Sequence, residues 1–167
     1  MWIKITINNK MITKLIFPFL FVSLFSLGQN QPVYEHQYLV KIGDIAPDFT
    51  INQLDGTSYK LSELRGNVVM LQFTASWCSV CRKEMPFIEN EIWIPGKEKG
   101  LKVIGIDRDE PKEKMEQLKD ITGITYPLAF DPEAAIFAKY AEIKAGVTRN
   151  VIIDRDGKII FLTRLFK

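Results

Sequence analysis

Two nearly continuous apolar segments, V-V-M-L-Q-F-T at 68–74 and L-K-V-I-G-I-D at 101–107, dominate the pattern of hydrophobic and polar positions. Such runs, bounded by glycine, are typical of strands buried on both faces of a sheet. Apolar positions on either side of Asp55-Gly56 and of Asp156-Gly157 predict two β-hairpins, because Asp-Gly is a preferred two-residue turn. A shorter strand is predicted at 126–130.

Helical patterns lie between these strands. The segment from Ser79 to about Trp93 predicts a helix kinked by Pro86, since proline removes a backbone donor. A further helix is predicted at 131–141, with its first residue, an aspartate, as its cap. The segment 111–121 predicts an amphipathic helix whose inward face consists of Met115, Leu118 and Ile121. Strands alternating with helices and ending in a hairpin predict an α/β sandwich with a mixed sheet.

The N-terminal residues have a different character from the rest. Lys10 and Lys14 precede an uncharged apolar run at 15–27, and a polar stretch follows, which is the order of a secretory signal peptide. The run is shorter than the roughly 20 residues that span a membrane comfortably. We therefore expect a signal peptide at 1–28, with Met11 as an alternative start, and export to the periplasm. The alternative is an uncleaved membrane anchor.

After this signal we expect a lead-in at 29–41 and one domain at 42–167. Hydrophobic residues make up 47% of the chain and charged residues 25%, which suits an ordinary folded domain with its own core. The net charge of +2 is dispersed, without the basic stripe that nucleic acids bind, so we expect no nucleic-acid partner. The mixed charges at 107–116 are expected to form a solvated loop and helix start, and His36 to lie on the surface.

The only two cysteines, Cys78 and Cys81, form a C-x-x-C pair. As a structural staple the pair would close a very short loop, where the entropic gain is least. As a zinc site it would supply two of four ligands, and His36 is the only histidine. The remaining interpretation is a pair that cycles between dithiol and disulfide.

Their position favours that third interpretation. A buried strand at 68–74 runs directly toward the predicted helix, so Cys78 falls at the helix N-terminus. The free N–H groups and the helix dipole stabilise a thiolate there, which lowers the pKa of the thiol. Cys81 lies one turn further on, within reach of a mixed disulfide formed on Cys78.

W-C-S-V-C-R-K-E-M-P at 77–86 resembles the active-site motif of the TlpA/ResA-like branch of the thioredoxin superfamily, whose relatives include the AhpC/TSA redoxins. G-D-I-A-P-D-F, V-V-M-L-Q-F-T and V-I-I-D-R-D-G-K-I are also similar to that family, and the resemblance covers 42–161. It implies a thioredoxin-like fold with an N-terminal β-hairpin extension. It also implies a thiol–disulfide oxidoreductase outside the cytoplasm. We expect this protein to act as a reductase of protein disulfides without cofactor or metal, although the same cycle can run in the oxidising direction. Its electrons would come from a redox partner, for example a membrane electron donor.

The family pattern also implies individual roles. Cys78 would be the exposed nucleophile and Cys81 the resolving thiol, with Trp77 beside them. Glu84 would assist proton transfer, and Pro86 would be the helix-kinking proline.

Three positions depart from the pattern. Ser79-Val80 stands between the cysteines, where the family commonly has proline before the second cysteine. Gln72 occupies the place of thioredoxin's buried aspartate and cannot take a proton, so proton handling would fall on Glu84 or water. Thr148 stands where the family has a cis-proline, and a trans peptide is expected because a cis bond before threonine costs roughly 2.5–4 kcal/mol.

Two alternative functions remain open at this point. Thr148 or Arg149 could reach the active site, and Arg149 could lower the pKa of Cys78 or bind a peroxide, as in a thiol peroxidase of peroxiredoxin type. Against this, Ala75 replaces the threonine that peroxiredoxins place three residues before their reactive cysteine. The other alternative is a thioredoxin-fold binding protein without redox turnover.

Overall fold

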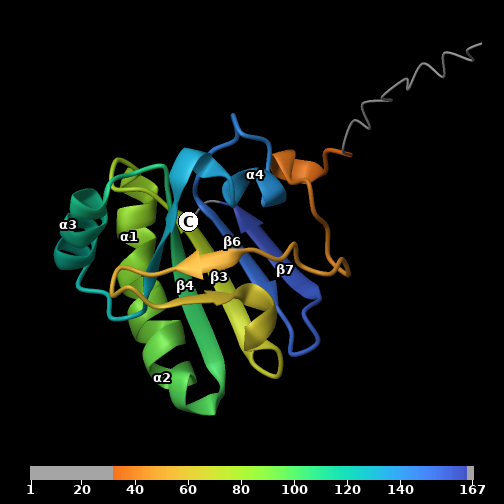
Figure 1. Ribbon diagram of the computed structural model, residues 1–167, viewed down its shortest axis with the longest axis horizontal. Coiled ribbons are helices and arrows are strands. Elements are labelled where there is room, and N and C mark those ends of the chain that lie inside the picture. The colour runs from red at the N-terminus through yellow and green to blue at the C-terminus, as the bar shows by residue number, and fades with distance from the viewer. Residues whose placement is uncertain (1–31, 165–167) are drawn as a thin grey trace, which may run out of the picture. The chain divides into compact units, whose positions relative to one another are not determined.

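The computed structural model describes residues 32–164, and Figure 1 shows their arrangement. A five-stranded sheet has the order β5-β4-β3-β6-β7. Strands β3, β4 and β5 are parallel, whereas β6 runs antiparallel to β3 and β7 antiparallel to β6. The strands are β3 (Val68–Thr74), β4 (Leu101–Arg108), β5 (Leu128–Asp131), β6 (Arg149–Ile153) and β7 (Ile159–Arg164). The predicted α/β fold with a mixed sheet is confirmed, and the apolar run at 68–74 coincides with β3.

Helices cover both faces of this sheet. The helical segments are α1 (Ser79–Phe87), its π-helical continuation η3 (Ile88–Trp93), α2 (Ile94–Gly96), α3 (Lys112–Thr122) and α4 (Phe137–Tyr140). Helices α1 and α3 pack through Met85 and Leu118 on the face that contains Met70 and Val103. Helix α4 covers the opposite face, where Phe73 contacts Phe137 edge-on.

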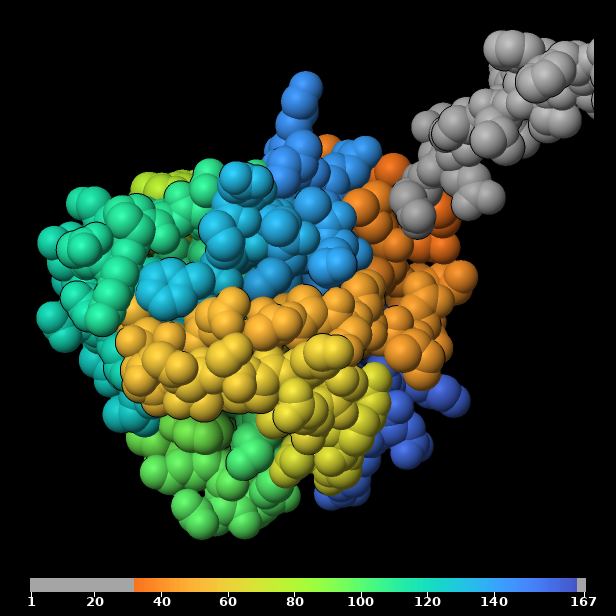
Figure 2. Space-filling view, viewed as in Figure 1, coloured from red at the N-terminus to blue at the C-terminus, as the bar shows by residue number. Residues whose placement is uncertain are grey.

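The predicted N-terminal hairpin is also present. Strands β1 (Thr50–Asn52) and β2 (Ser58–Lys60) pair in antiparallel register, and Ile51 is buried in the same core cluster as α4. In Figure 2 this yellow-orange segment crosses the front of the domain, between the blue α4 region and the green α2 region. The short 3-10 turns are η1 (Glu35–Gln37), η2 (Leu61–Leu64), η4 (Lys97–Lys99) and η5 (Pro132–Ala134).

Part of the lead-in packs onto the domain. Tyr38 and Val40 are buried in the core, and Tyr38 forms a bridge to Ala141. The Tyr38 hydroxyl donates to the Thr163 carbonyl oxygen at 2.6 Å. His36 is exposed, as predicted. The predicted signal peptide lies outside the described residues, and none of the helices within residues 32–164 has both the length and the apolar character to cross a membrane.

Three local predictions are wrong. Ile121 is 73% exposed, because it lies six residues after Met115 and therefore off the buried helix face. The predicted helix at 131–141 breaks into η5 and α4, since Glu133 and Ala134 have positive φ angles and the Asp131 carboxylate caps Ile136 and Phe137 instead. Asp107 is not solvated but fully buried at the end of β4, opposite Thr74 of β3.

Candidate active site

The two cysteines form a disulfide where β3 leads into α1. Cys78 is the N-cap of α1, and its Sγ accepts a hydrogen bond from the Cys81 backbone N–H at 3.1 Å. Cys78 is 7% exposed and Cys81 is 0% exposed. Both cysteines are thus largely buried in the disulfide state, and Cys78 is the more accessible of the two.

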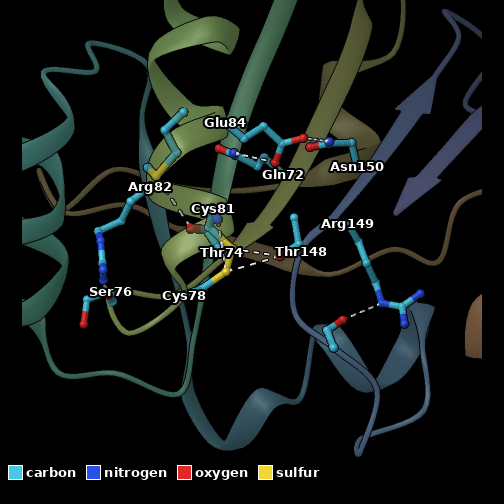
Figure 3. The surroundings of a disulfide bond; sticks show 12 residues. Gln72, Thr74, Ser76, Cys78, Cys81, Arg82, Glu84, Thr148, Arg149 and Asn150 are labelled. Atoms are coloured by element: carbon cyan, nitrogen blue, oxygen red, sulfur yellow. Dashed lines mark hydrogen bonds between the residues drawn. A yellow bond between two sulfur atoms is a disulfide. The ribbon is translucent and has the colours of Figure 1, made fainter. Parts of the chain in front are cut away.

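Thr148 faces both sulfurs from the loop that enters β6 (Figure 3). Its Oγ1 lies 3.2 Å from Cys78 Sγ and 3.3 Å from Cys81 Sγ. Disulfide sulfurs carry no proton, so the hydroxyl is the donor, and its single hydrogen is shared between the two contacts. Residues 32–164 contain no cis peptide bond, and the peptide before Thr148 is therefore trans, as predicted.

Glu84 lies one helical turn after Cys81 and is buried beneath α1. Its carboxylate accepts from Asn150 Nδ2 at 2.6 Å and from Gln72 Nε2 at 3.3 Å. Gln72 Oε1 in turn accepts from the buried Tyr126 hydroxyl at 2.6 Å. Burial raises the pKa of Glu84, although the two amide donors oppose that shift by stabilising the carboxylate. The carboxyl group is thus buried and hydrogen-bonded within the protein.

The loop before Cys78 is fixed from a neighbouring strand end. Ser76 donates through both its backbone N–H and its hydroxyl to the Glu110 carboxylate, the hydroxyl at 2.6 Å. Arg82 of α1 donates to the Ser76 carbonyl oxygen. Trp77, next along this anchored loop, is 62% exposed beside the disulfide, which agrees with its predicted place.

Arg149 does not reach the sulfurs, so of the two residues that could have reached them Thr148 is the one that does. Its Nε donates to the Gly146 carbonyl oxygen at 2.9 Å and its Nη2 to the His36 carbonyl oxygen at 2.7 Å. The guanidinium lies 4.5 Å from the Tyr38 ring centre, on the side turned away from Cys78 (Figure 3). Successive side chains at the start of a strand point to opposite faces, so Thr148 and Arg149 cannot both face the disulfide.

The other predicted residues surround this centre without bonding to it. Ser79 is exposed and Val80 packs partly against the core. Pro86 lies within α1, immediately before the π-helical continuation of the helix. Within residues 32–164 no group of three or more His, Cys, Asp or Glu side chains is arranged to hold a metal ion.

Sequence reasoning missed Asn150, Tyr126 and Glu110. Asn150 follows Thr148 by two positions, and this period-2 spacing places it on the same face of β6. Glu110 and Tyr126 have no comparable signal, because loops bring them to the site from other parts of the chain.

Comparison with known proteins agrees with this geometry. The AhpC/TSA family model matches residues 42–162. Thiol-disulfide oxidoreductase ResA of Geobacillus thermodenitrificans is 31% identical over 120 residues, which cover 72% of this chain and 67% of the relative. ResA of Bacillus anthracis is 29% identical over 153 residues, which cover 92% and 87%.

Solved structures give the same result. A Bacteroides thetaiotaomicron protein, provisionally named a protein disulfide isomerase, is 62% identical with a TM-score of 0.76, covering 78% of this chain and 83% of that one. A Chlorobium tepidum protein, provisionally named the thiol:disulfide interchange protein DsbE, is 30% identical with a TM-score of 0.69, covering 77% and 88%. The chain therefore belongs to the AhpC/TSA family, among its ResA-like thiol–disulfide oxidoreductases of the thioredoxin superfamily.

Proposed function

We propose that this oxidoreductase works outside the cytoplasm as a reductase of protein disulfides, with Cys78 as the attacking thiol and Cys81 as the resolving thiol. The observation that carries the proposal is the unequal burial of the two cysteines, with Cys78 7% exposed and Cys81 fully enclosed. The apolar segment at 15–27 supports export, in which case a membrane electron donor would return the protein to its dithiol form.

In the reducing direction, Cys81 would release the mixed disulfide. Cys81 stays next to Cys78 after attack on a substrate, because both belong to the first turn of α1. A thiol held this close displaces the substrate rapidly, and the substrate leaves as a thiol. Glu84, one turn further along the same helix face, would take the Cys81 proton.

Two serine variants test these roles. Reduced Cys81→Ser should form a stable mixed disulfide with oxidised insulin, because Cys78 attacks and nothing resolves the product. Reduced Cys78→Ser should react at least tenfold more slowly, since its one thiol is buried. Equal trapping by both variants would refute the assignment.

The direction is tested by equilibrium with glutathione. A potential below about −200 mV supports a reductase, whereas one near the roughly −120 mV of DsbA would contradict that direction. Hydrogen peroxide should oxidise the reduced protein no faster than an ordinary thiol. A peroxide rate orders of magnitude higher would indicate a peroxidase instead.

A further inference from the structure

The Thr148 hydroxyl lies within hydrogen-bonding distance of both active-site sulfurs. It is the donor to Cys78 Sγ at 3.2 Å and to Cys81 Sγ at 3.3 Å, and Thr148 itself is buried. Cys78 Sγ has a second donor in the Cys81 backbone N–H. Among the described residues, Thr148 is the hydrogen-bonding contact of Cys81 Sγ.

The hydroxyl is held in place by the fold. Thr148 directly precedes β6, whose next residues Arg149 and Asn150 pair with Phe73 and Gln72 of β3. Strand β3 also leads into the cysteine loop, so the donor and both acceptors are held at the same end of the paired strands β3 and β6. Threonine is stiff at its first side-chain torsion, which limits how far the hydroxyl can turn away.

We propose that the Thr148 hydroxyl is a shared hydrogen-bond donor that stabilises first the Cys78 thiolate and then the Cys81 thiolate during one reaction cycle. This inference rests on the thiol–disulfide exchange proposed above. It assigns to Thr148 a catalytic role, since the hydroxyl touches both reacting atoms.

The two steps balance as follows. The Cys78 thiolate attacks one sulfur of the substrate disulfide, a mixed disulfide forms, and the other substrate sulfur leaves as a thiolate with the electron pair. Cys81, after losing its proton, attacks Cys78 Sγ, and the first substrate sulfur leaves as a second thiolate. The substrate has gained two electrons, and the protein has lost two in forming the Cys78–Cys81 bond; solvent or Glu84 carries the protons.

Because Cys81 is fully buried, its thiolate cannot rely on water and needs an internal donor.

DTNB, an aromatic disulfide that releases one coloured thiolate at each step, separates these two steps. The first release reports attack by Cys78 and the second reports resolution by Cys81. The reduced full chain would be compared with Thr148→Val, which removes the hydroxyl at similar shape, and with Thr148→Ser, which keeps a hydroxyl. Thr148→Ala replaces the valine variant if that protein does not fold.

The expected signature is a crossing of pH profiles. Losing a donor to a thiolate lowers the thiolate population near neutral pH by about tenfold. The less stabilised thiolate is intrinsically more nucleophilic, which recovers roughly threefold of that loss. Thr148→Val should therefore attack about threefold more slowly at neutral pH and about threefold faster at alkaline pH, where Cys78 is fully ionised in both proteins. Its second release should also be slower at neutral pH, and Thr148→Ser should restore most of both rates.

Attack rates of Thr148→Val that match the wild-type profile would overturn the proposal. So would equal slowing at every pH in the valine and serine variants, because that result would show a packing defect. If the wild-type protein reacts with DTNB but reduces no protein disulfide, the proposed function fails, while the DTNB profiles still decide the role of Thr148.

Discussion

Asp107 is a carboxylic acid enclosed in the core near the active-site loop. It is 0% exposed, and neither carboxylate oxygen has a hydrogen-bond partner among the described residues. Burial, and next the negative charge of Glu110, raise the pKa of Asp107 to about 8, and the charge of Asp131 acts in the same direction. We therefore predict that Asp107 is mostly protonated at neutral pH. Asp107→Asn keeps the shape of the neutral acid and removes its ionisation.

The sign of the effect on stability follows from proton binding. An ordinary aspartate ionises near 3.8, so between that pH and about 8 the unfolded chain has lost a proton that the folded protein still holds. The free energy of unfolding therefore falls as pH rises through this window and is not reduced further above it. The whole shift corresponds to roughly 6 kcal/mol, and relaxation and water penetration reduce such penalties. We expect wild type to lose about 3 kcal/mol more than Asp107→Asn between about pH 5 and pH 8.5.

Urea unfolding of the oxidised proteins at these two pH values measures the difference. The pKa values of Glu84 and Asp131 are also raised by burial, and they give slopes of the same sign in both proteins, so the comparison isolates Asp107. Asp120→Asn, an exposed change on α3, is the matched control and should follow wild type. Parallel loss of stability in wild type and Asp107→Asn would refute a protonated Asp107.

Two further predictions concern charged groups around the site. Arg149→Met should lower the free energy of unfolding by about 1–2 kcal/mol, because two hydrogen bonds from a charged donor are lost while the cost of burying that charge is relieved. The rate at which peroxide oxidises Cys78 should stay within about twofold of wild type. A large drop in that rate would show that Arg149 acts on the sulfur. Glu110→Gln can satisfy only one of the two Ser76 donors, so the Ser76 amide should exchange its hydrogen about tenfold faster by NMR. The same variant removes a charge that raises the pKa of Asp107, and its stability should fall less between the two pH values; an unchanged fall would contradict that coupling.

The main elements were predictable because their residues satisfy local rules and core burial together. The run at 68–74 is apolar throughout except for Gln72 and Thr74, and it forms the central strand β3 with those boundaries. The helix that follows begins at Ser79, which makes Cys78 its N-cap as the sequence predicted. Local patterning and tertiary burial favour the same structure here, and this agreement is what allows these elements to be predicted from the sequence.

Other residues show which contacts the sequence alone does not determine. Arg149 was one of two residues that could have reached the sulfurs, but strand alternation turns it away once Thr148 faces them. Asp107 belonged both to the predicted buried strand at 101–107 and to the predicted solvated stretch at 107–116, and it is buried because β4 continues to Arg108. The Glu84–Asn150 contact joins residues on α1 and β6, 66 positions apart. Such a pair becomes visible only when the register of the sheet is known.

The same limit applies to the redox potential, because one of the two donors to Cys78 Sγ lies outside the C-x-x-C motif. The donors that the structure gives to Cys78 Sγ are the Cys81 backbone N–H and the Thr148 hydroxyl, whereas Ser79 between the cysteines is exposed. The first donor accompanies any helix capped by its attacking cysteine. The second comes from a residue 70 positions away. Each donor to a thiolate stabilises the reduced form and so raises the potential. A relative with the same Ser-Val dipeptide but proline in place of Thr148 would lack one of these donors and should be the stronger reductant.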